Sequence, residues 1–341
     1  ATAELLELRS GGSSGEPVAV WHDLGSVRAH AAHGERDRSV WAGSLVPRRG
    51  YREAVVGLLD GADPSVHRFL RRGVIVPSRE EVERRYLSAD APVAATLAEL
   101  NAFQPHVIHA YGSFVEMLLA HVQASQAPFR RPALITYSSD ELGEAARRSI
   151  ERELGVPVLS TYEAIEAFKI GFECDRRNGF HLNVDLYPLR IEEGSGEVIL
   201  SNLVNRATVL LNYRIGDLAT LSPTPCSCGR ALPLMSRLDG RRDGVLQRAD
   251  GTPFLPMAAS LILAREPGVW QYQIREVRPL HLDVDIVAGP PCDRPAAAAR
   301  IAANLAHEIG GDARVRVEFV DRIERTAGGK VRRIVACSHA G

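Results

Sequence analysis

The middle of the chain alternates short apolar runs of strand length with stretches that have a helical pattern. The apolar runs cover residues 107–110, 133–137 and 156–160, and the helical patterns cover residues 114–124 and 141–154. Strands that alternate with helices in this way normally lie parallel in one sheet, because each helix carries the chain back to the start of the next strand. The sequence therefore predicts an α/β protein with a βαβ-type parallel sheet.

Two other patterns divide the rest of the chain. Between residues 181 and 221, short strands are separated by turn residues, which predicts an antiparallel or barrel-like subdomain. After Asp243, strand patterns alternate with helices, which predicts a small α+β domain. The strands lie near Val245 and at residues 271–275, 280–287 and 314–320, and the helices at residues 258–264 and 296–309. We expect two domains, residues 1–242 and residues 243–341.

Length and composition suit a globular protein with no electrostatic preference for nucleic acid. The chain of 341 residues is long enough for two domains, and 45% of its residues are hydrophobic, which allows a substantial core. Its 41 basic and 42 acidic residues give a net charge of −1, so we expect neither nucleic acid nor an anionic membrane surface as a partner. No apolar run approaches a membrane span and Ala1 opens no signal peptide, so a cytoplasmic protein is expected.

A loop rich in glycine and serine occupies residues 10–17 (SGGSSGEP). Glycine lets backbone N–H groups approach an anion without hindrance from a Cβ atom, and serine hydroxyls add further donors. Such a loop can wrap a polyphosphate, although no lysine follows it as in a Walker loop. A flexible linker is the alternative. The candidate phosphate-binding residues are Ser10, Gly12, Ser13, Ser14 and Gly15.

Two later segments each place a charged residue where a ligand could reach it. Asp217, in the segment NYRIGDL, follows an apolar run at residues 208–213, so we expect it in a turn at the end of a strand. Its carboxylate could accept hydrogen bonds from both ribose hydroxyls of a nucleotide. Lys330 follows two glycines, so we expect a compact cation at the tip of a mobile loop. An ordinary turn and a solvated surface lysine are the alternatives.

In their order along the chain, the Gly/Ser loop, the Asp217 segment and the Lys330 tail (TAGGK) suggest ATP-dependent activation of a carboxylate. From Leu8 to about Val335, the chain resembles the adenylate-forming superfamily, and in particular its phenylacetate–coenzyme A ligase-like branch. The resemblance implies a large N-terminal domain and a small mobile C-terminal lid. It also implies roles for Ser139 and Asp140 beside the adenine and acyl pockets, Tyr162 against adenine, Glu166 on Mg²⁺, Asp217 and Arg241 at the ribose, Asp243 as the hinge and Lys330 as the catalytic lysine.

The chain departs from the family pattern in two places. Glu163 and Ile165 stand where the family usually has glycine and serine or threonine, so one close backbone approach and one hydroxyl on the phosphate side are missing. We therefore expect either a different contact to the α-phosphate or impaired catalysis. Relatives carry on the order of a hundred residues before the Gly/Ser loop, whereas this chain reaches that loop at residue 10. Part of the large domain is therefore expected to be absent.

The resemblance implies a reaction in two halves. A carboxylate oxygen first attacks the α-phosphorus of ATP to give an acyl adenylate and pyrophosphate, while Mg²⁺ and Lys330 neutralise the developing charge. The acyl group then passes to the thiol of coenzyme A or of a carrier-protein pantetheine, after the small domain rotates about Asp243. Two alternatives stay open, namely nucleotidyl transfer to a cofactor and a non-catalytic homologue that binds the nucleotide.

The identity of the carboxylic acid is poorly specified by the sequence. Tyr111, Tyr137 and Phe168 lie near segments that line the acyl pocket in relatives, and an aromatic acid would suit them. Packing in the core is the alternative for each of them. His106 and His109 are expected to be structural, because the reaction already has a leaving group and needs no strong base.

Five cysteines give a separate signal. Cys226 and Cys228 lie in a loop with proline and serine, and Cys174 and His181 precede them, so the four residues could form a Cys₃His set for tetrahedral Zn²⁺. Four protein ligands leave no position for a substrate, so such a zinc ion would be structural. Small residues near turns, without a metal, are the alternative. The odd count and the lack of a secretion signal favour reduced thiols over disulfides.

Overall fold

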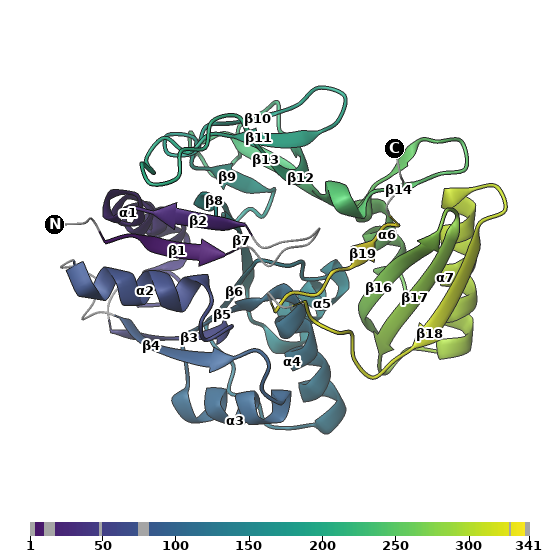
Figure 1. Ribbon diagram of the computed structural model, residues 1–341. Helices are drawn as coiled ribbons and strands as arrows, with labels where there is room; N and C mark the ends of the chain where they lie inside the picture. Colours follow the sequence, from purple (N-terminus) through teal and green to yellow (C-terminus); the bar gives the residue numbers. More distant parts are fainter. Residues whose placement is uncertain (1–3, 10–17, 48–49, 74–81, 327–328, 338–341) are drawn as a thin grey trace.

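A mixed sheet of eleven strands forms the centre of the computed structural model, which describes residues 4–9, 18–47, 50–73, 82–326 and 329–337 (Figure 1). Five strands at one end of this sheet run parallel to their neighbours. In spatial order they are β4 (Val82–Ser88), β3 (Tyr51–Gly57), β5 (Val107–Tyr111), β6 (Leu134–Ser138) and β7 (Val158–Ala164). Their carboxyl ends meet along one rim of the sheet, which is where α/β proteins usually bind ligands.

Six antiparallel strands continue the same sheet beyond β7. In spatial order they are β8 (Phe168–Glu173), β9 (Phe180–Leu182), β13 (Leu234–Arg241), β12 (Tyr213–Leu221), β11 (Glu197–Leu200) and β10 (Leu189–Ile191). The antiparallel pairing of β7 with β8 joins the two halves. Residues from both halves can therefore meet where β7 ends.

Helices cover both faces of the parallel strands. On one face, α3 (Val93–Phe103), α4 (Gly112–Ser125) and α5 (Glu144–Ser149), followed by a π-helical turn (Ile150–Leu154), share an apolar core with β3, β5 and β6. The other face carries α1 (Leu24–Trp41), whose Trp41 packs beside Tyr51. Next to α1 lie α2 (Ala62–Gly73) and the hairpin of β1 (Leu6–Arg9) and β2 (Ala19–His22).

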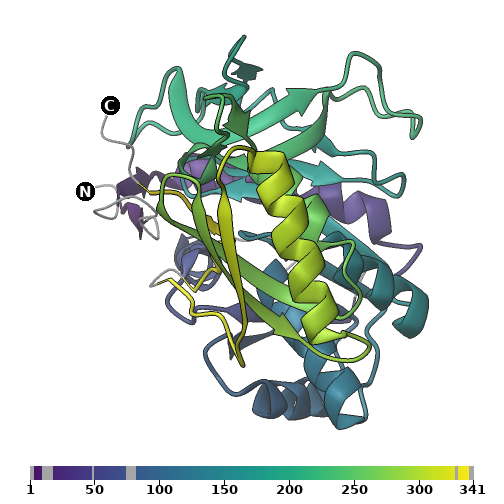
Figure 2. The ribbon, with the colours of Figure 1, turned by 90° about the vertical axis from the view of Figure 1, so that its right-hand side faces the viewer.

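The C-terminal part of the chain builds a second core of its own. A 3₁₀ turn (Arg242–Gly244) leads from β13 into this part. Its elements are β14 (Leu246–Gln247), β15 (Pro253–Phe254), α6 (Pro256–Leu263), β16 (Val269–Arg278), β17 (His281–Ala288), α7 (Arg294–Ile309), β18 (Arg314–Phe319) and β19 (Ile334–Val335). The sheet order is β18-β17-β16-β19, and Figure 2 shows α7 lying across it.

The predicted fold class is confirmed, and the strands and helices predicted in the central part overlap β5, α4, β6, α5 and β7. One strand prediction is wrong. The apolar run at residues 208–213 forms no strand before Tyr213, because its apolar side chains find no core: Val209 and Leu211 are each 65% exposed. None of the described helices is both long and apolar enough to cross a membrane.

Candidate functional site

Three of the residues predicted to bind the nucleotide come together from β7, β12 and β13. Asp217 and Arg241 are opposite each other in the pairing of β12 with β13. The Tyr162 hydroxyl of β7 donates a hydrogen bond of 2.7 Å to one Asp217 carboxylate oxygen, and Arg241 Nη1 donates one of 3.2 Å to the other. Asp217 therefore lies inside a strand, and the prediction that it occupies a turn at a strand end is wrong. The strand register, which the sequence does not display, fixes its position.

The Asp217 carboxylate is largely withdrawn from solvent, with 13% of its side chain exposed. Burial raises the pKa of this carboxyl, while Arg241, the Tyr162 hydroxyl and Lys330 act in the opposite direction. Burial and the Asp217 charge together raise the pKa of the Tyr162 phenol, so the phenol stays a neutral donor. The charges that act on the Asp217 carboxyl thus include one from the C-terminal tail, that of Lys330.

Glu166, the predicted magnesium ligand, lies just beyond β7 and close to this group. Its carboxylate accepts a hydrogen bond of 3.4 Å from the Tyr213 hydroxyl. Burial raises the pKa of the Glu166 carboxyl, the Asp217 charge raises it further, and Arg241 lowers it. A carboxylate such as that of Glu166 offers the hard oxygen ligand that Mg²⁺ prefers.

Glu163, which replaces the glycine of the family pattern, lies in a different environment from Tyr162. Its carboxylate is 3.8 Å from Lys169 Nζ, and the same ammonium group is 2.8 Å from Asp37 of α1. The structure therefore places the glutamate side chain in a charged layer between the sheet and α1. The motif alone does not predict this layer.

Asp243, the predicted hinge, connects the end of β13 to the chain's C-terminal tail. Arg241 Nε lies 3.5 Å from one of its carboxylate oxygens, and Arg332 Nη2 donates a hydrogen bond of 3.0 Å to the other. The residue sits in the 3₁₀ turn that joins the two cores. A rotation at this position would have to exchange or break the contact to Arg332.

The Lys330 tail lies against the carboxyl ends of the parallel strands. Val331 N donates a hydrogen bond of 3.1 Å to Asp140, whose carboxylate also accepts bonds from the backbone and side chain of Ser113 at the start of α4. Arg325 Nη1 donates to the Gly329 carbonyl (2.7 Å) and to Ser113 Oγ (3.1 Å). Asp140 therefore links the tail to α4, and the Lys330 side chain is left exposed.

Some of the remaining predicted binding residues are exposed, some are buried, and some lie outside the described residues. Ser139 is exposed and has a left-handed backbone with φ of 74°. Tyr111 lines a cavity at the ends of β3, β4 and β5. Tyr137 packs in the core beneath α3 and α4, and Phe168 stacks on His30 at 4.4 Å, so the contacts of both are those of core residues. The Gly/Ser loop at residues 10–17 lies outside the described residues.

The same cavity contains residues that sequence reasoning missed, namely Asp63 and Tyr86. Asp63 stands in the first turn of α2, and Tyr86 belongs to β4. Their position could have indicated them, because both lie near the carboxyl ends of parallel strands, where α/β proteins usually bind ligands. The sequence pattern predicts neither β3 nor β4, so it does not indicate these two residues.

The four predicted metal ligands come together from three separate segments. Cys174 follows β8, His181 belongs to β9, and Cys226 and Cys228 lie between β12 and β13. Their ligand atoms all lie within 4.8 Å of one another, with 3.7 Å between the sulfurs of Cys174 and Cys226 and 3.4 Å from Cys228 Sγ to His181 Nε2. Tetrahedral zinc with ordinary bond lengths requires about 3.8 Å between two sulfurs and about 3.5 Å from sulfur to nitrogen. The donor set and its spacing therefore fit Zn²⁺, and the sulfurs are too far apart for a disulfide.

The chain matches no protein-family model. It is 24% identical over 285 residues to the phenylacetate–coenzyme A ligase of Thermus thermophilus, an alignment that covers 72% of this chain and 64% of that relative. The chain thus spans less than two thirds of that relative's length.

Two solved structures share the fold. One is 2-hydroxyisobutyryl-CoA ligase in its postadenylation state, with a TM-score of 0.75 and 16% identity over 97% of this chain and 73% of that one. The other is an anthranilate CoA ligase in complex with anthranoyl-AMP, with a TM-score of 0.68 and 16% identity over 95% of this chain and 65% of that one. The chain thus has the fold of the adenylate-forming ligases and is similar in sequence to their phenylacetate–coenzyme A ligase-like branch, so the resemblance predicted from its motifs is confirmed.

Proposed function

We propose that the chain carries the adenylating site of an enzyme that activates a carboxylic acid with ATP and passes the acyl group to a thiol. The observation that supports this proposal best is the hydrogen-bonded group of Tyr162, Asp217 and Arg241, on whose carboxylate the Lys330 charge also acts. Asp217 is a buried acceptor that suits the ribose of a nucleotide. Lys330 is a cation that suits the negative charge that develops at the phosphates during the reaction.

In the adenylation half, Asp217 is the acceptor for the ribose hydroxyls, and Arg241 opposes the rise in the pKa of that carboxyl that burial causes. Tyr162 packs beside the adenine, and the exposed Lys330 ammonium neutralises charge at the α-phosphate. Glu166 would hold Mg²⁺, which when bound supplies further positive charge at the phosphates. Pyrophosphate leaves, and the acyl adenylate remains.

In the thiol half, residues 243–341 move as a lid about Asp243. The contact between Arg332 and Asp243 and the bond from Val331 to Asp140 hold the tail in its present place. Breaking both would withdraw Lys330 and clear a path for the thiol of coenzyme A or of a carrier-protein pantetheine. Cys174, His181, Cys226 and Cys228 would hold a structural Zn²⁺ that fixes the β8–β9 and β12–β13 connections.

ATP–pyrophosphate exchange across a panel of aryl, fatty and amino acids tests this function. Exchange that depends on an added acid is expected, and AMP should appear when a thiol is supplied. Release of pyrophosphate without AMP, in the presence of thiol, would instead favour nucleotidyl transfer to a cofactor. ATP binding without exchange for any acid would favour a non-catalytic homologue.

Asp217→Ala is expected to weaken ATP binding by about tenfold to a hundredfold, because the ribose hydroxyls lose a charged acceptor. Calorimetric titration with ATP measures this. Asp285→Ala is the matched control, since it also removes an aspartate paired to an arginine (Arg275, 2.8 Å), but in the second sheet. Equal affinity in Asp217→Ala and the parent protein would contradict the ribose assignment.

A further inference from the structure

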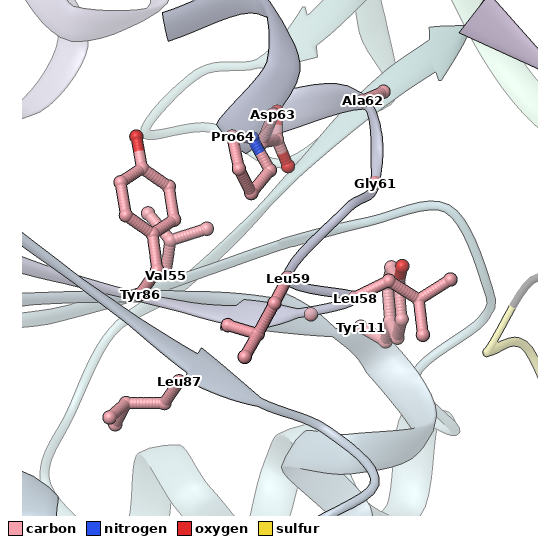
Figure 3. Close-up of a pocket in the computed structure, with 11 residues that line it drawn as sticks. Val55, Leu58, Leu59, Gly61, Ala62, Asp63, Pro64, Tyr86, Leu87 and Tyr111 are labelled. Atoms are coloured by element: carbon pink, nitrogen blue, oxygen red, sulfur yellow. The ribbon is translucent and has the colours of Figure 1, made fainter. Parts of the chain in front are cut away.

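A cavity opens at the ends of β3, β4 and β5, and its lining includes Tyr111, which the sequence predicted for the acyl pocket (Figure 3). It measures about 250 Å³, including space continuous with solvent. Leu58 and Leu59 of the turn after β3, Tyr86 of β4 and Tyr111 of β5 supply apolar and aromatic walls. Among the described residues that line the cavity, Asp63 alone carries a charge.

The cavity lies directly beside the Lys330 tail. A Cβ atom added to Gly329 would stand 3.0 Å from the Tyr111 ring and 3.1 Å from the Leu58 side chain. The residue before Lys330 therefore packs on two of the cavity's walls. A molecule in the cavity would have one end next to the place where Lys330 acts.

Asp63 brings a carboxylate with few partners to the described lining of the cavity. Its carboxylate makes no hydrogen bond within the described part of the chain, and its nearest charge partner is His109 Nε2 at 3.9 Å. The side chain stays 48% exposed although protein surrounds it, because it faces the cavity. Burial raises the pKa of the Asp63 carboxyl, while the neighbouring His109 acts in the opposite direction, so a positive charge brought by a ligand would favour the ionised form.

The carboxylates of the charged layer behind Asp63 are paired with cations of that layer. Arg84 pairs with Glu53, and Lys169 pairs with both Asp37 and Glu163. Burial lowers the pKa of His30 to about 3 and that of His67 to about 4, so both rings are neutral. Each of these three carboxylates thus has a cation within 4 Å, whereas within the described residues no lysine or arginine lies that close to the Asp63 carboxylate. A ligand that carries a positive charge would therefore be stabilised in the cavity.

We propose that this cavity binds the acyl part of the substrate, and that the substrate is a carboxylic acid with a protonated amino group at the end remote from its carboxyl. Asp63 binds the ammonium group, and the carboxyl lies toward Tyr111 and Leu58, next to the Lys330 tail. Figure 3 shows Asp63 at the start of α2 and Tyr111 with Leu58 on a different wall of the cavity. This inference rests on the proposed function for the reaction itself.

Matched pairs of acids test the inference in pyrophosphate exchange with the full chain. The pairs are 4-(aminomethyl)benzoate against 4-ethylbenzoate and 6-aminohexanoate against heptanoate, in which a methyl group replaces the ammonium. The parent protein is expected to prefer the amino acid of each pair. Asp63→Asn is expected to reduce that preference in kcat/KM by about tenfold to a hundredfold. Asp60→Asn, in the exposed turn just before α2, should leave it unchanged.

Two outcomes overturn the inference: no preference for the amino acids in the parent, or an unchanged preference in Asp63→Asn. Exchange with neutral acids alone would refute this inference and leave the proposed function standing. Failure of every acid would refute the proposed function, and ligand-observed NMR with 4-(aminomethyl)benzoate then decides the inference without catalysis. Binding to the parent and loss of binding in Asp63→Asn support it, whereas absent or equal binding refutes it.

Discussion

Replacing Lys330 by alanine is expected to slow adenylate formation by about 10²-fold to 10³-fold while leaving ATP binding nearly unchanged. The lysine would act on charge that develops in the transition state, and the ground-state contacts to the ribose come from other residues. The tail should stay docked, because its bonds to Asp140 and Arg325 come from the backbone of Val331 and Gly329. Single-turnover adenylation and calorimetric ATP titration separate the two effects.

Lys330→Arg is the informative companion variant. The chain has only two lysines, Lys169 and Lys330, among 41 basic residues, and Lys169 is already paired with Asp37. Arginine keeps the charge but spreads it over a planar fork, so it should restore the rate only in part if a compact cation is required. Unchanged adenylate formation in Lys330→Ala would remove the lysine from the mechanism.

The parts of the fold that the sequence predicted are those with strong local periodicity. β5, α4 and β6 have apolar residues at strand or helix spacing that face one core, so pattern and packing agree. The failure at residues 208–213 has the opposite cause, because apolar residues there remain exposed in an irregular segment. An apolar run predicts a strand only where a core is present to receive it.

The sequence predicts those residues of the candidate site that belong to a recognisable motif. It does not predict residues that only the fold brings together. The pairing of Tyr162 with Asp217 joins residues 55 positions apart, and the motifs had indicated both. The contact of Lys169 with Asp37 spans 132 positions and follows from the packing of α1 on the sheet. Asp63 was missed for the same reason, since its significance depends on a cavity and not on its neighbours in sequence.

Protein prepared without chelators is expected to contain one zinc ion per chain, and Cys226→Ser is expected to lose most of it. Cys226 is buried and lies 3.7 Å from the Cys174 sulfur, so the variant removes one of four thiolate or imidazole ligands from a closed site. Elemental analysis measures the metal content, and thermal unfolding measures the consequence for stability.

The melting temperature of Cys226→Ser should fall markedly, because the site joins three segments that otherwise meet only through short strands. Binding of zinc contributes apparent free energies of about 10 to 16 kcal/mol in isolated zinc-finger peptides, and less is expected where a domain is already folded. Cys292→Ser is the matched control, since Cys292 lies outside the cluster, and it should keep both zinc and melting temperature. ATP binding should persist in Cys226→Ser, as Asp217 and Tyr162 are not ligands of the metal. Full zinc content in that variant, or no zinc in the parent protein, would reject this ligand set.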